Sequence, residues 1–533
     1  MGLPEYLTID EYKVRKSKLD EIRALGVNPY PHHFCPSHDV KSLIEQYEGV
    51  EVGTYEEALE KRSDHVVVAG RVILHRAMGK NIFAQIQEEL GQIQLMFNRD
   101  TTKVHGLKEG GEVTCHKFIE KKLDLGDIIG VEGHLFRTQK GELTIMVHEV
   151  TLLTKSLLPL PDKYAGLKDK ETRYRKRHLD LISSPEVMKT FMMRSQIITL
   201  MRMFFNKEGF FEMETPTLER LYGGAQAKPF TTHLNALHLD MYLRISLELP
   251  LKKLIVGGFN RIFQIGKLFR NEGIDHTHNP EFTMVEFYAA YWDYNDQMKF
   301  TERLFQYIAM ELFQTTKLGI RKDKRGNEHE IDLAAPWTRI SMHDAIAKYA
   351  GYHVDKMSDD EIKAILREKT EVAKEKLAGA IERGVLIQLM FEEFVEHHLI
   401  QPHFIIDHPI ETTPLCKLHR NPELAKKGIV ERFELFILGV EFANSYTELN
   451  DPELQRSLLE RQERLLESGD EEANPLDEEF LEAIYQGMPP TGGNGIGIDR
   501  LVMLFTGQAS IRDVIFFPVM KNAGDLVVDE SNV

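Results

Sequence analysis

The stretch FRNEGIDHTHNPEFTMVEFY, which spans Phe269–Tyr288, contains the connection between two runs that have the composition of β-strands. These runs are RIFQIGKLFR and FTMVEFYAAY, and similar runs, rich in β-branched and aromatic residues, are YLRISLEL, RFELFILGVEFAN and GIGIDRLVML. They alternate with helical segments, but they do not follow the short, regular strand–helix–strand rhythm of a parallel sheet. We therefore expect an antiparallel sheet flanked by helices, which is an α+β domain.

A helix and a short strand are predicted upstream of this stretch. Apolar residues recur at helical spacing from Phe191 to Phe204, Gly209 ends the pattern, and FFEMETP is then predicted as a strand that closes at Pro216. Downstream, Gly492–Leu501 reads GGNGIGIDRL. Such a glycine-rich run is compatible with a close-packed turn from a strand to a helix that binds no ligand. Without a following Gly-Lys-Ser/Thr it is not a Walker loop.

A second region with the composition of β-strands extends from His65 to about Thr151. The runs VVVAGRVIL, IFAQIQ, GQIQLMF, DIIGVEGHLF and ELTIMVHEV predict five strands, with one longer connection between the third and the fourth. This pattern suits a small Greek-key barrel of the OB type, which often binds single-stranded nucleic acid on exposed aromatic side chains. Before it, Thr8 and Glu11 predict a helix that begins with a capping box, and Gly26 predicts its end. The basic residues of that helix either form a solvated face or contact RNA.

These patterns divide the chain into two domains and their connections. The expected parts are a helical extension (1–64), an OB-fold domain (65–155), a basic linker (156–182), the α+β domain (183–520) with a helical insertion at about 341–420, and a mobile tail (521–533).

Composition excludes several classes of protein. The 83 acidic residues against 66 basic ones give a formal charge of −17, which argues against a protein that coats nucleic acid without specificity. No stretch approaches the roughly 18 apolar residues of a membrane helix, and the N-terminus does not read as a signal peptide. Three scattered cysteines, Cys35, Cys115 and Cys416, suit neither a disulfide framework nor a zinc site. We expect a cytoplasmic protein without a membrane segment.

The unit ending at Pro216, Phe269–Tyr288 and Gly492–Leu501 resemble, in this order, motifs 1, 2 and 3 of the class II aminoacyl-tRNA synthetases. The sequence around these motifs narrows the resemblance to the bacterial-type class II lysyl-tRNA synthetases. That sequence comprises GVNPYP, MGKNIFAQIQ, GGAQAKPF, LRISLEL, HLIQPHFI, NSYTELNDP and PPTGGNGIGIDR. The resemblance extends from about Leu19 to Met520 and implies that the α+β domain is catalytic. It implies ATP-dependent activation of L-lysine to lysyl-adenylate and transfer of lysine to the 3′ end of tRNA(Lys), by a homodimer whose interface is largely motif 1.

The resemblance also implies an ATP site. Its residues are Arg270, Glu272, His278, Phe282, Glu434, Glu441 and Arg500, of which Arg270 and Arg500 are catalytic. Arg270 matches the arginine that bridges the amino-acid carboxylate and the α-phosphate, because a planar guanidinium can hold two oxygens at once. Phe282 and Arg500 match a pair that sandwiches the adenine. The alternatives are a buried Phe and an Arg in a surface salt bridge.

A metal site is expected at Glu434 and Glu441, which are seven residues apart. On a helix this spacing places them on one face, and across an antiparallel hairpin or a bulged strand they also converge. In the resembling family the matching glutamates bind Mg²⁺, and carboxylate oxygens suit that ion. Without the resemblance, both would be taken for ordinary surface acids.

The implied lysine site is a pocket with fixed negative charge. Its residues are Gly224, Glu248, Arg270, Glu286, Tyr288, Asn444, Tyr446, Glu448 and Gly495. Glu248 and Gly224 match the group that holds the α-amino group, whereas Glu286, Tyr288 and Glu448 match the group around the ε-ammonium. Several relatives carry Phe where this chain has Tyr446, a change that keeps the ring.

In the barrel, Phe83 and Gln94 match positions that stack on and hydrogen-bond an anticodon uridine, with Arg76 and Glu142 nearby. The alternative for Phe83 is a place in the barrel core. The basic linker is expected to be either solvated or tRNA-facing. Two further functions compete with tRNA charging. One is transfer of lysine to a protein acceptor, and the other is nucleic-acid binding without catalysis.

Overall fold

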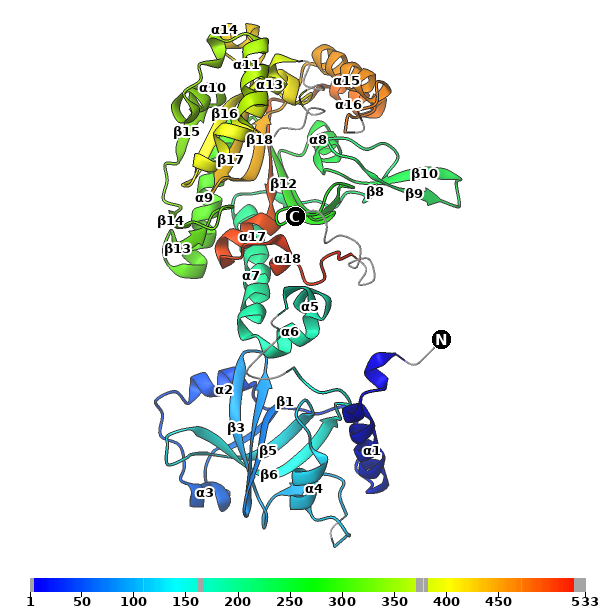
Figure 1. Ribbon diagram of the computed structural model, residues 1–533, viewed down its shortest axis with the longest axis vertical. Helices are drawn as coiled ribbons and strands as arrows, with labels where there is room; N and C mark the ends of the chain where they lie inside the picture. The colour runs from blue at the N-terminus through cyan, green and yellow to red at the C-terminus, as the bar shows by residue number, and fades with distance from the viewer. Residues whose placement is uncertain are drawn as a thin grey trace. The chain divides into compact units, whose positions relative to one another are not determined.

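The computed structural model describes residues 4–108, 110–161, 167, 169–370, 377, 382–470 and 472–521 (Figure 1). Contacts divide the chain into two compact units, Met1–Lys189 and Thr190–Val533. The predicted tail lies, after residue 521, outside the described residues. Among the described residues, no helix combines the length and the apolar character that crossing a membrane requires.

The first unit contains a closed β-barrel. Its strands are β1 (His65–Met78), β2 (Asn81–Glu88), β3 (Gly91–Asn98), β4 (Lys103–Val104), β5 (Ile128–Arg137) and β6 (Leu143–Thr154). Its helices are α1 (Asp10–Ala24), α2 (Val40–Gln46), α3 (Tyr55–Leu59), α4 (Cys115–Lys122), α5 (Lys170–Arg175) and α6 (Arg177–Ser183). The strand order is β3-β2-β1-β5-β6-β4, and the pairing of β3 with β6 closes the barrel. The predicted OB-type barrel is confirmed, and the long third connection contains β4 and α4.

Two predictions for the N-terminal helix have different outcomes. The capping box is wrong, because α1 begins after Ile9 and the Thr8 hydroxyl instead donates to the Glu5 carbonyl at 2.6 Å. Gly26 does follow the helix end, with a φ of +84° that favours glycine. Basic side chains of α1 find partners within the chain. Arg15 is buried and donates to the Leu125 carbonyl at 2.9 Å.

The predicted linker is partly helical, because it contains α5 and all of α6 except its last residue. Arg177 is buried and forms an ion pair with Asp180 at 2.6 Å, and Arg173 reaches the same carboxylate at 2.8 Å. These two arginines are therefore held within their own unit.

The second unit is built on an eight-stranded sheet. Its strands and those of two smaller sheets are β7 (Phe211–Glu212), β8 (Leu218–Glu219), β9 (Phe230–Leu234), β10 (Leu239–Leu243), β11 (Arg261–Phe269), β12 (Glu281–Ala290), β13 (Lys317–Lys322), β14 (Glu328–Asp332), β15 (Thr338–Ser341), β16 (His403–Pro409), β17 (Ile429–Ile437), β18 (Val440–Thr447) and β19 (Thr491–Gly497). The helices are α7 (Pro185–Lys207), α8 (Glu248–Val256), α9 (Tyr294–Phe313), α10 (Met342–Ala345), α11 (Asp359–Lys369), α13 (Arg383–Phe394), α14 (Pro422–Lys426), α15 (Pro452–Glu467), α16 (Glu478–Gly487), α17 (Ile498–Thr506) and α18 (Ile511–Val514).

The large sheet has the order β15-β16-β17-β18-β19-β12-β11-β7. The expected antiparallel sheet is confirmed for the pairings from β16 to β11, while the edge strands β15 and β7 pair in parallel. Figure 1 shows β8, β9 and β10 (green, at the right) reaching away from this sheet.

Three strand predictions need correction. YLRISLEL is not one strand, because β10 ends at Leu243 and α8 begins at Glu248. GIGIDRLVML changes from strand to helix at Ile498, and FFEMETP forms only the two-residue β7. The stretch 341–420 is helix-rich, but it also contains β16, which pairs with β17 in the large sheet.

Alternation along β12 gives the sheet two different faces. Val285 and Phe287 are buried in an aromatic core with α7, α9 and α17. Tyr288 belongs instead to a second core, formed with α8, α15 and α16. Glu286 shares that second face because it lies two residues from Tyr288, and this face carries the polar groups described next.

Candidate active site

Two adjoining pockets lie on the second unit's polar face. The acidic pocket is lined by all nine residues of the predicted lysine site and by Glu434, among others. The arginine pocket is lined by the other predicted ATP-site residues, Arg270, Glu272, His278, Phe282, Glu441 and Arg500, together with Asn444 and Gly495. Because Arg270, Glu441, Asn444 and Gly495 line both pockets, the two sets predicted from the sequence meet at these residues.

The acidic pocket contains carboxylates that the fold holds rigidly. Glu286 Oε1 accepts hydrogen bonds from the Ser246 hydroxyl and the Leu247 amide, each at 2.9 Å, and its Oε2 accepts one from Tyr288 at 3.2 Å. Burial, helped by the nearby charge of Glu248, raises the pKa of Glu286 to about 7 against these hydrogen bonds. This carboxylate therefore changes its charge close to neutral pH.

Two further pocket residues are joined directly. The Tyr446 hydroxyl donates to Glu248 at 2.5 Å, a contact that a phenylalanine at this position cannot make. Lys252 is fully buried and pairs with Glu248 at 2.5 Å and also with Glu448. The sequence analysis missed Lys252, although Glu248 and Lys252 stand four residues apart on α8, a spacing typical of helical ion pairs.

Glycines in β19 leave room for the pocket. A methyl group on Gly493 would overlap the carboxylate of Glu448 and the ring of Tyr288. A methyl group on Gly495 would come within 2.9 Å of Met284. The prediction named Gly495 and missed Gly493, although both belong to the same glycine-rich run. Only glycine leaves space for Glu448 to lie against this strand.

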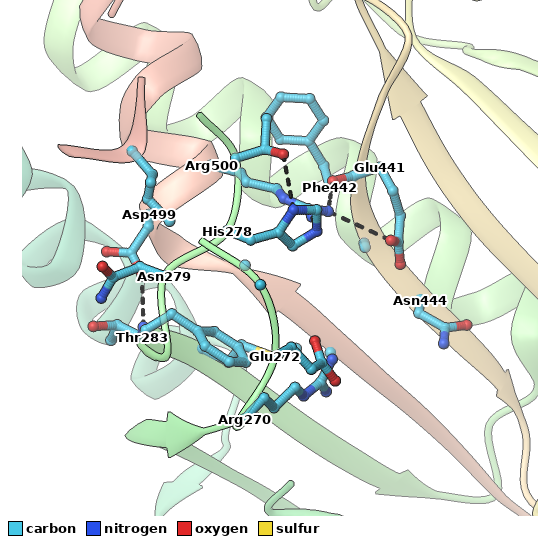
Figure 2. A pocket seen from close by; sticks show the side chains of 18 residues that line it. Arg270, Glu272, His278, Asn279, Thr283, Glu441, Phe442, Asn444, Asp499 and Arg500 are labelled. Carbon is cyan, nitrogen blue, oxygen red and sulfur yellow. Dashed lines mark hydrogen bonds and ion pairs between the residues drawn. The ribbon is translucent and has the colours of Figure 1, made fainter. Parts of the chain in front are cut away.

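The arginine pocket combines cations with an aromatic ring. The guanidinium carbon of Arg270 lies 5.2 Å from the centre of the Phe282 ring. Arg500 donates to the main-chain carbonyl of Glu441 at 2.7 Å and lies 3.2 Å from Nε2 of His278 (Figure 2). This residue extends from α17 across to β18, so part of its positive charge faces the pocket.

His278 is oriented from both sides. Its Nδ1 lies 2.7 Å from Asp275, on the same loop, and its Nε2 faces Arg500. Burial alone would raise the pKa of Asp275. Hydrogen bonds from His278 and Thr277 outweigh burial and hold this pKa well below its usual range. Asp275 therefore stays ionised and fixes the His278 ring. The only sign of this role in the sequence is that Asp275 stands three residues before His278.

Glu434 and Glu441 converge across a hairpin. β17 and β18 are antiparallel with an irregularity after Leu435, so the helical alternative for these two glutamates is wrong and the bulged hairpin is confirmed. Burial raises the pKa of both carboxyls, and the charge of Glu434 raises that of Glu441 further. Arg432, also missed, donates to Glu434 at 2.6 Å and to Asn444 at 2.9 Å. It thereby connects a residue of the predicted ATP site with a residue of the predicted lysine site.

The predicted anticodon residues lie on one outer region of the barrel. Inward positions of β2 are Ile82, Ala84 and Ile86, so Phe83 points outward, and the barrel-core alternative is wrong. The ring is half-buried beside a small cluster with Met96 and Phe136.

The other three residues are connected to Phe83 by strand pairing. Arg76 is the partner of Phe83 across β1 and β2. The Gln94 amide donates to Thr144 at 2.9 Å, and the Thr144 hydroxyl donates to the Glu142 carbonyl at 3.1 Å. The structure thus places Arg76, Phe83 and Gln94 on neighbouring strands of the barrel, with Glu142 directly before β6.

Comparison with known proteins agrees with this arrangement. The family model for class II tRNA synthetases (D, K and N) matches residues 169–521, and the model for the OB-fold nucleic acid binding domain matches residues 66–153. The lysine–tRNA ligase of Chlamydia caviae is 52% identical over 522 residues, which cover 98% of this chain and 99% of that protein. The lysine–tRNA ligase of Chlamydia pneumoniae is 54% identical over 519 residues (97% and 98%), and that of Shouchella clausii is 46% identical over 514 residues (96% and 97%). The chain therefore belongs to the class II lysyl-tRNA synthetase family.

Proposed function

We propose that this protein activates L-lysine with ATP to form lysyl-adenylate and then transfers lysine to the 3′ end of tRNA(Lys). The observation that carries the proposal is the acidic pocket, in which Glu248, Glu286 and Glu448 are buried next to Arg270. A buried carboxylate without a cation is unfavourable, so the pocket favours an amino acid with a distal ammonium group. A pocket for aspartate would require cations where this pocket has acids.

In the first step, a carboxylate oxygen of lysine attacks the α-phosphorus of ATP. A new P–O bond forms, the bond to the β-phosphate breaks, and pyrophosphate leaves with the electron pair. This reaction depends mainly on positioning and on neutralisation of charge. Arg270 suits that role because it lines both pockets and presents a fork of donors. Phe282 and Arg500 are proposed to hold the adenine ring.

In the second step, a hydroxyl of the terminal tRNA adenosine attacks the lysyl carbonyl carbon, and AMP leaves. Residues 65–155 are proposed to bind the anticodon, and residues 183–520 to carry out catalysis. The barrel also separates this proposal from transfer of lysine to a protein, which has no need of an anticodon reader.

Glu434 and Glu441 are proposed to hold Mg²⁺ together with the ATP phosphates. Their carboxyls are neighbouring like charges on paired strands, and a cation would relieve their repulsion. No group of three or more metal-binding side chains occurs in the part of the chain that the structure describes, so phosphate and water oxygens would complete the shell, as Mg²⁺ prefers. The ion would neutralise the charge that develops on pyrophosphate.

The active form is proposed to be a cytoplasmic homodimer. Large apolar side chains near motif 1 support the dimer. Phe211 and Tyr291 are 65% and 73% exposed and line one hollow with Phe259. Exposed apolar patches of this kind are typical of protein interfaces. The sparse cysteines support the reducing compartment.

Phe83→Ala should separate the two reactions. Stacking on one base contributes roughly 1–3 kcal/mol, so kcat/KM for tRNA(Lys) in an aminoacylation assay should fall by about 5–150-fold. Lysine-dependent ATP–pyrophosphate exchange should remain unchanged, because the barrel is not involved in that step. Phe83→Tyr, which keeps the ring, is the matched control. Equal loss in both assays, or no loss in charging, would contradict the anticodon role.

A further inference from the structure

We propose that Lys252 is an internal counter-ion that sets the net charge of the acidic pocket, and so positions Glu248 and Glu448 for a substrate with two ammonium groups. This inference rests on the proposed function and adds a positioning residue to it. Lys252 does not line the pocket surface. It affects the pocket indirectly, because it contacts Glu248 and Glu448, which do line the pocket.

The first support is geometric. The ammonium of Lys252 is fully buried on α8 and contacts one carboxylate from its own helix and one from the segment after β18. Neither carboxylate oxygen of Glu448 has a hydrogen-bond partner among the residues that the structure describes, but Oε2 forms an ion pair with Lys252, whereas no ion pair reaches Oε1 there. An orphaned buried carboxylate oxygen is unfavourable unless a ligand satisfies it. Lys252 thus engages one oxygen of Glu448 and leaves the other to a substrate.

The second support is the balance of charge. When ionised, Glu248, Glu286 and Glu448 contribute three negative charges, and Lys252 contributes one positive charge. The two remaining negative charges match the α- and ε-ammonium groups of lysine, and Arg270 matches its carboxylate. Without Lys252, one buried carboxylate would stay uncompensated in the complex and would take up a proton instead.

In the described part of the chain, Lys252 is the only cation that forms an ion pair with Glu248 or Glu448. The rings of Tyr446 and Phe480 lie 5.5 Å and 6.0 Å from its ammonium, and the thiol of Cys416 is close enough for the charge of Lys252 to affect its pKa. Burial alone would lower the pKa of Lys252, but the charges of Glu248 and Glu448 outweigh burial and raise it. Lys252 is therefore charged throughout the neutral range. Burial raises the pKa of Glu448 well above its ordinary value, and Lys252 is the main charge that opposes this rise.

The test replaces Lys252 with Met, which removes the charge at similar volume, and with Gln, which keeps hydrogen-bond donors without charge. Gln also serves as the second neutral variant if the Met protein does not fold. Lys253→Met is the matched control, because Lys253 is the next residue on α8 and forms a long, exposed ion pair with Glu479, at 3.8 Å. Lys252→Arg, which keeps the charge, should restore part of the lost lysine affinity.

Loss of the positive charge removes the main influence that lowers the pKa of Glu448, so this carboxyl binds a proton at higher pH. A neutral carboxyl does not attract an ammonium group. In a plot of kcat/KM for lysine against pH, the midpoint of the acidic limb should therefore move to higher pH, by about one pH unit or more. At pH 7 the lysine KM in ATP–pyrophosphate exchange should rise by at least ~10-fold, since one pKa unit corresponds to a factor of ten, while the ATP KM stays within about twofold. Calorimetry in buffers of different ionisation enthalpy should show additional proton release on lysine binding.

An unchanged acidic limb with an unchanged lysine KM in both neutral variants would overturn the proposal. So would equal weakening for lysine and ATP without a pH shift, because this result would indicate a purely structural role. If the unaltered protein failed to exchange with lysine at all, the proposed function would be wrong instead. The two failures are therefore distinguishable.

Discussion

Replacing Glu448 with Gln should lower kcat/KM for lysine in ATP–pyrophosphate exchange by roughly 10²–10⁴-fold. The side chain is buried, lies against Gly493, and shares Lys252 with Glu248. Gln keeps the shape but removes the charge that attracts the ε-ammonium, and the loss of one partner from a buried charge pair costs about 3–5 kcal/mol. The effect should fall mainly on the lysine KM, because the charge is present in the ground state as well as in the transition state.

Glu467→Gln is a suitable control, because that carboxylate is exposed at the end of α15. It should leave exchange within about twofold, as expected for a surface substitution. A loss of less than about threefold for Glu448→Gln, with the protein folded, would contradict the role assigned to Glu448.

Replacing Arg270 with Lys should lower kcat for exchange by roughly 10²–10³-fold, the size expected when a donor to transition-state charge is removed. Lysine keeps the positive charge but presents no planar fork, so it cannot hold the carboxylate and the α-phosphate together. Arg270 lines both pockets, and its guanidinium is placed by Phe282 and by the Ile245 carbonyl at 3.4 Å. A decrease in kcat larger than the increase in KM would indicate loss of a transition-state contact.

Arg456→Lys is the matched control. Arg456 lies on α15, does not line either pocket, and forms an ion pair with Glu478 at 2.8 Å. It should leave kcat unchanged. A folded Arg270→Lys enzyme with an unchanged kcat would remove Arg270 from the proposed mechanism.

The central sheet and the pocket residues could be predicted because their patterns are local. The run FTMVEFYAAY is rich in β-branched and aromatic residues, so its strand, β12, could be predicted from composition. The glycine-rich run indicates a close-packed strand, and Gly493 and Gly495 both leave room beside it. The motif resemblance then brought the distant segments together, which periodicity alone cannot do.

What the sequence did not predict depends on tertiary packing. Thr8 has the residue pattern of a capping box, but a short preceding helix takes its hydroxyl. The run YLRISLEL has strand composition, yet the chain turns after Leu243 so that Glu248 opens α8 and faces the pocket. Lys252 was missed because a lysine on a helix is usually solvated. Its burial follows from the position of Glu448, almost 200 residues later in the chain.

The account depends on recognition of a distal ammonium by buried carboxylates. Its most direct test is the ratio of kcat/KM for L-lysine to that for L-norleucine, which lacks only the terminal nitrogen, in ATP–pyrophosphate exchange at pH 7.5. A site built to bind such a polar group should discriminate by about 10⁴–10⁵-fold, because norleucine would leave the negative charge that Lys252 does not balance without a partner. A ratio below about tenfold would show that the carboxylates do not read the ammonium group and would contradict the account.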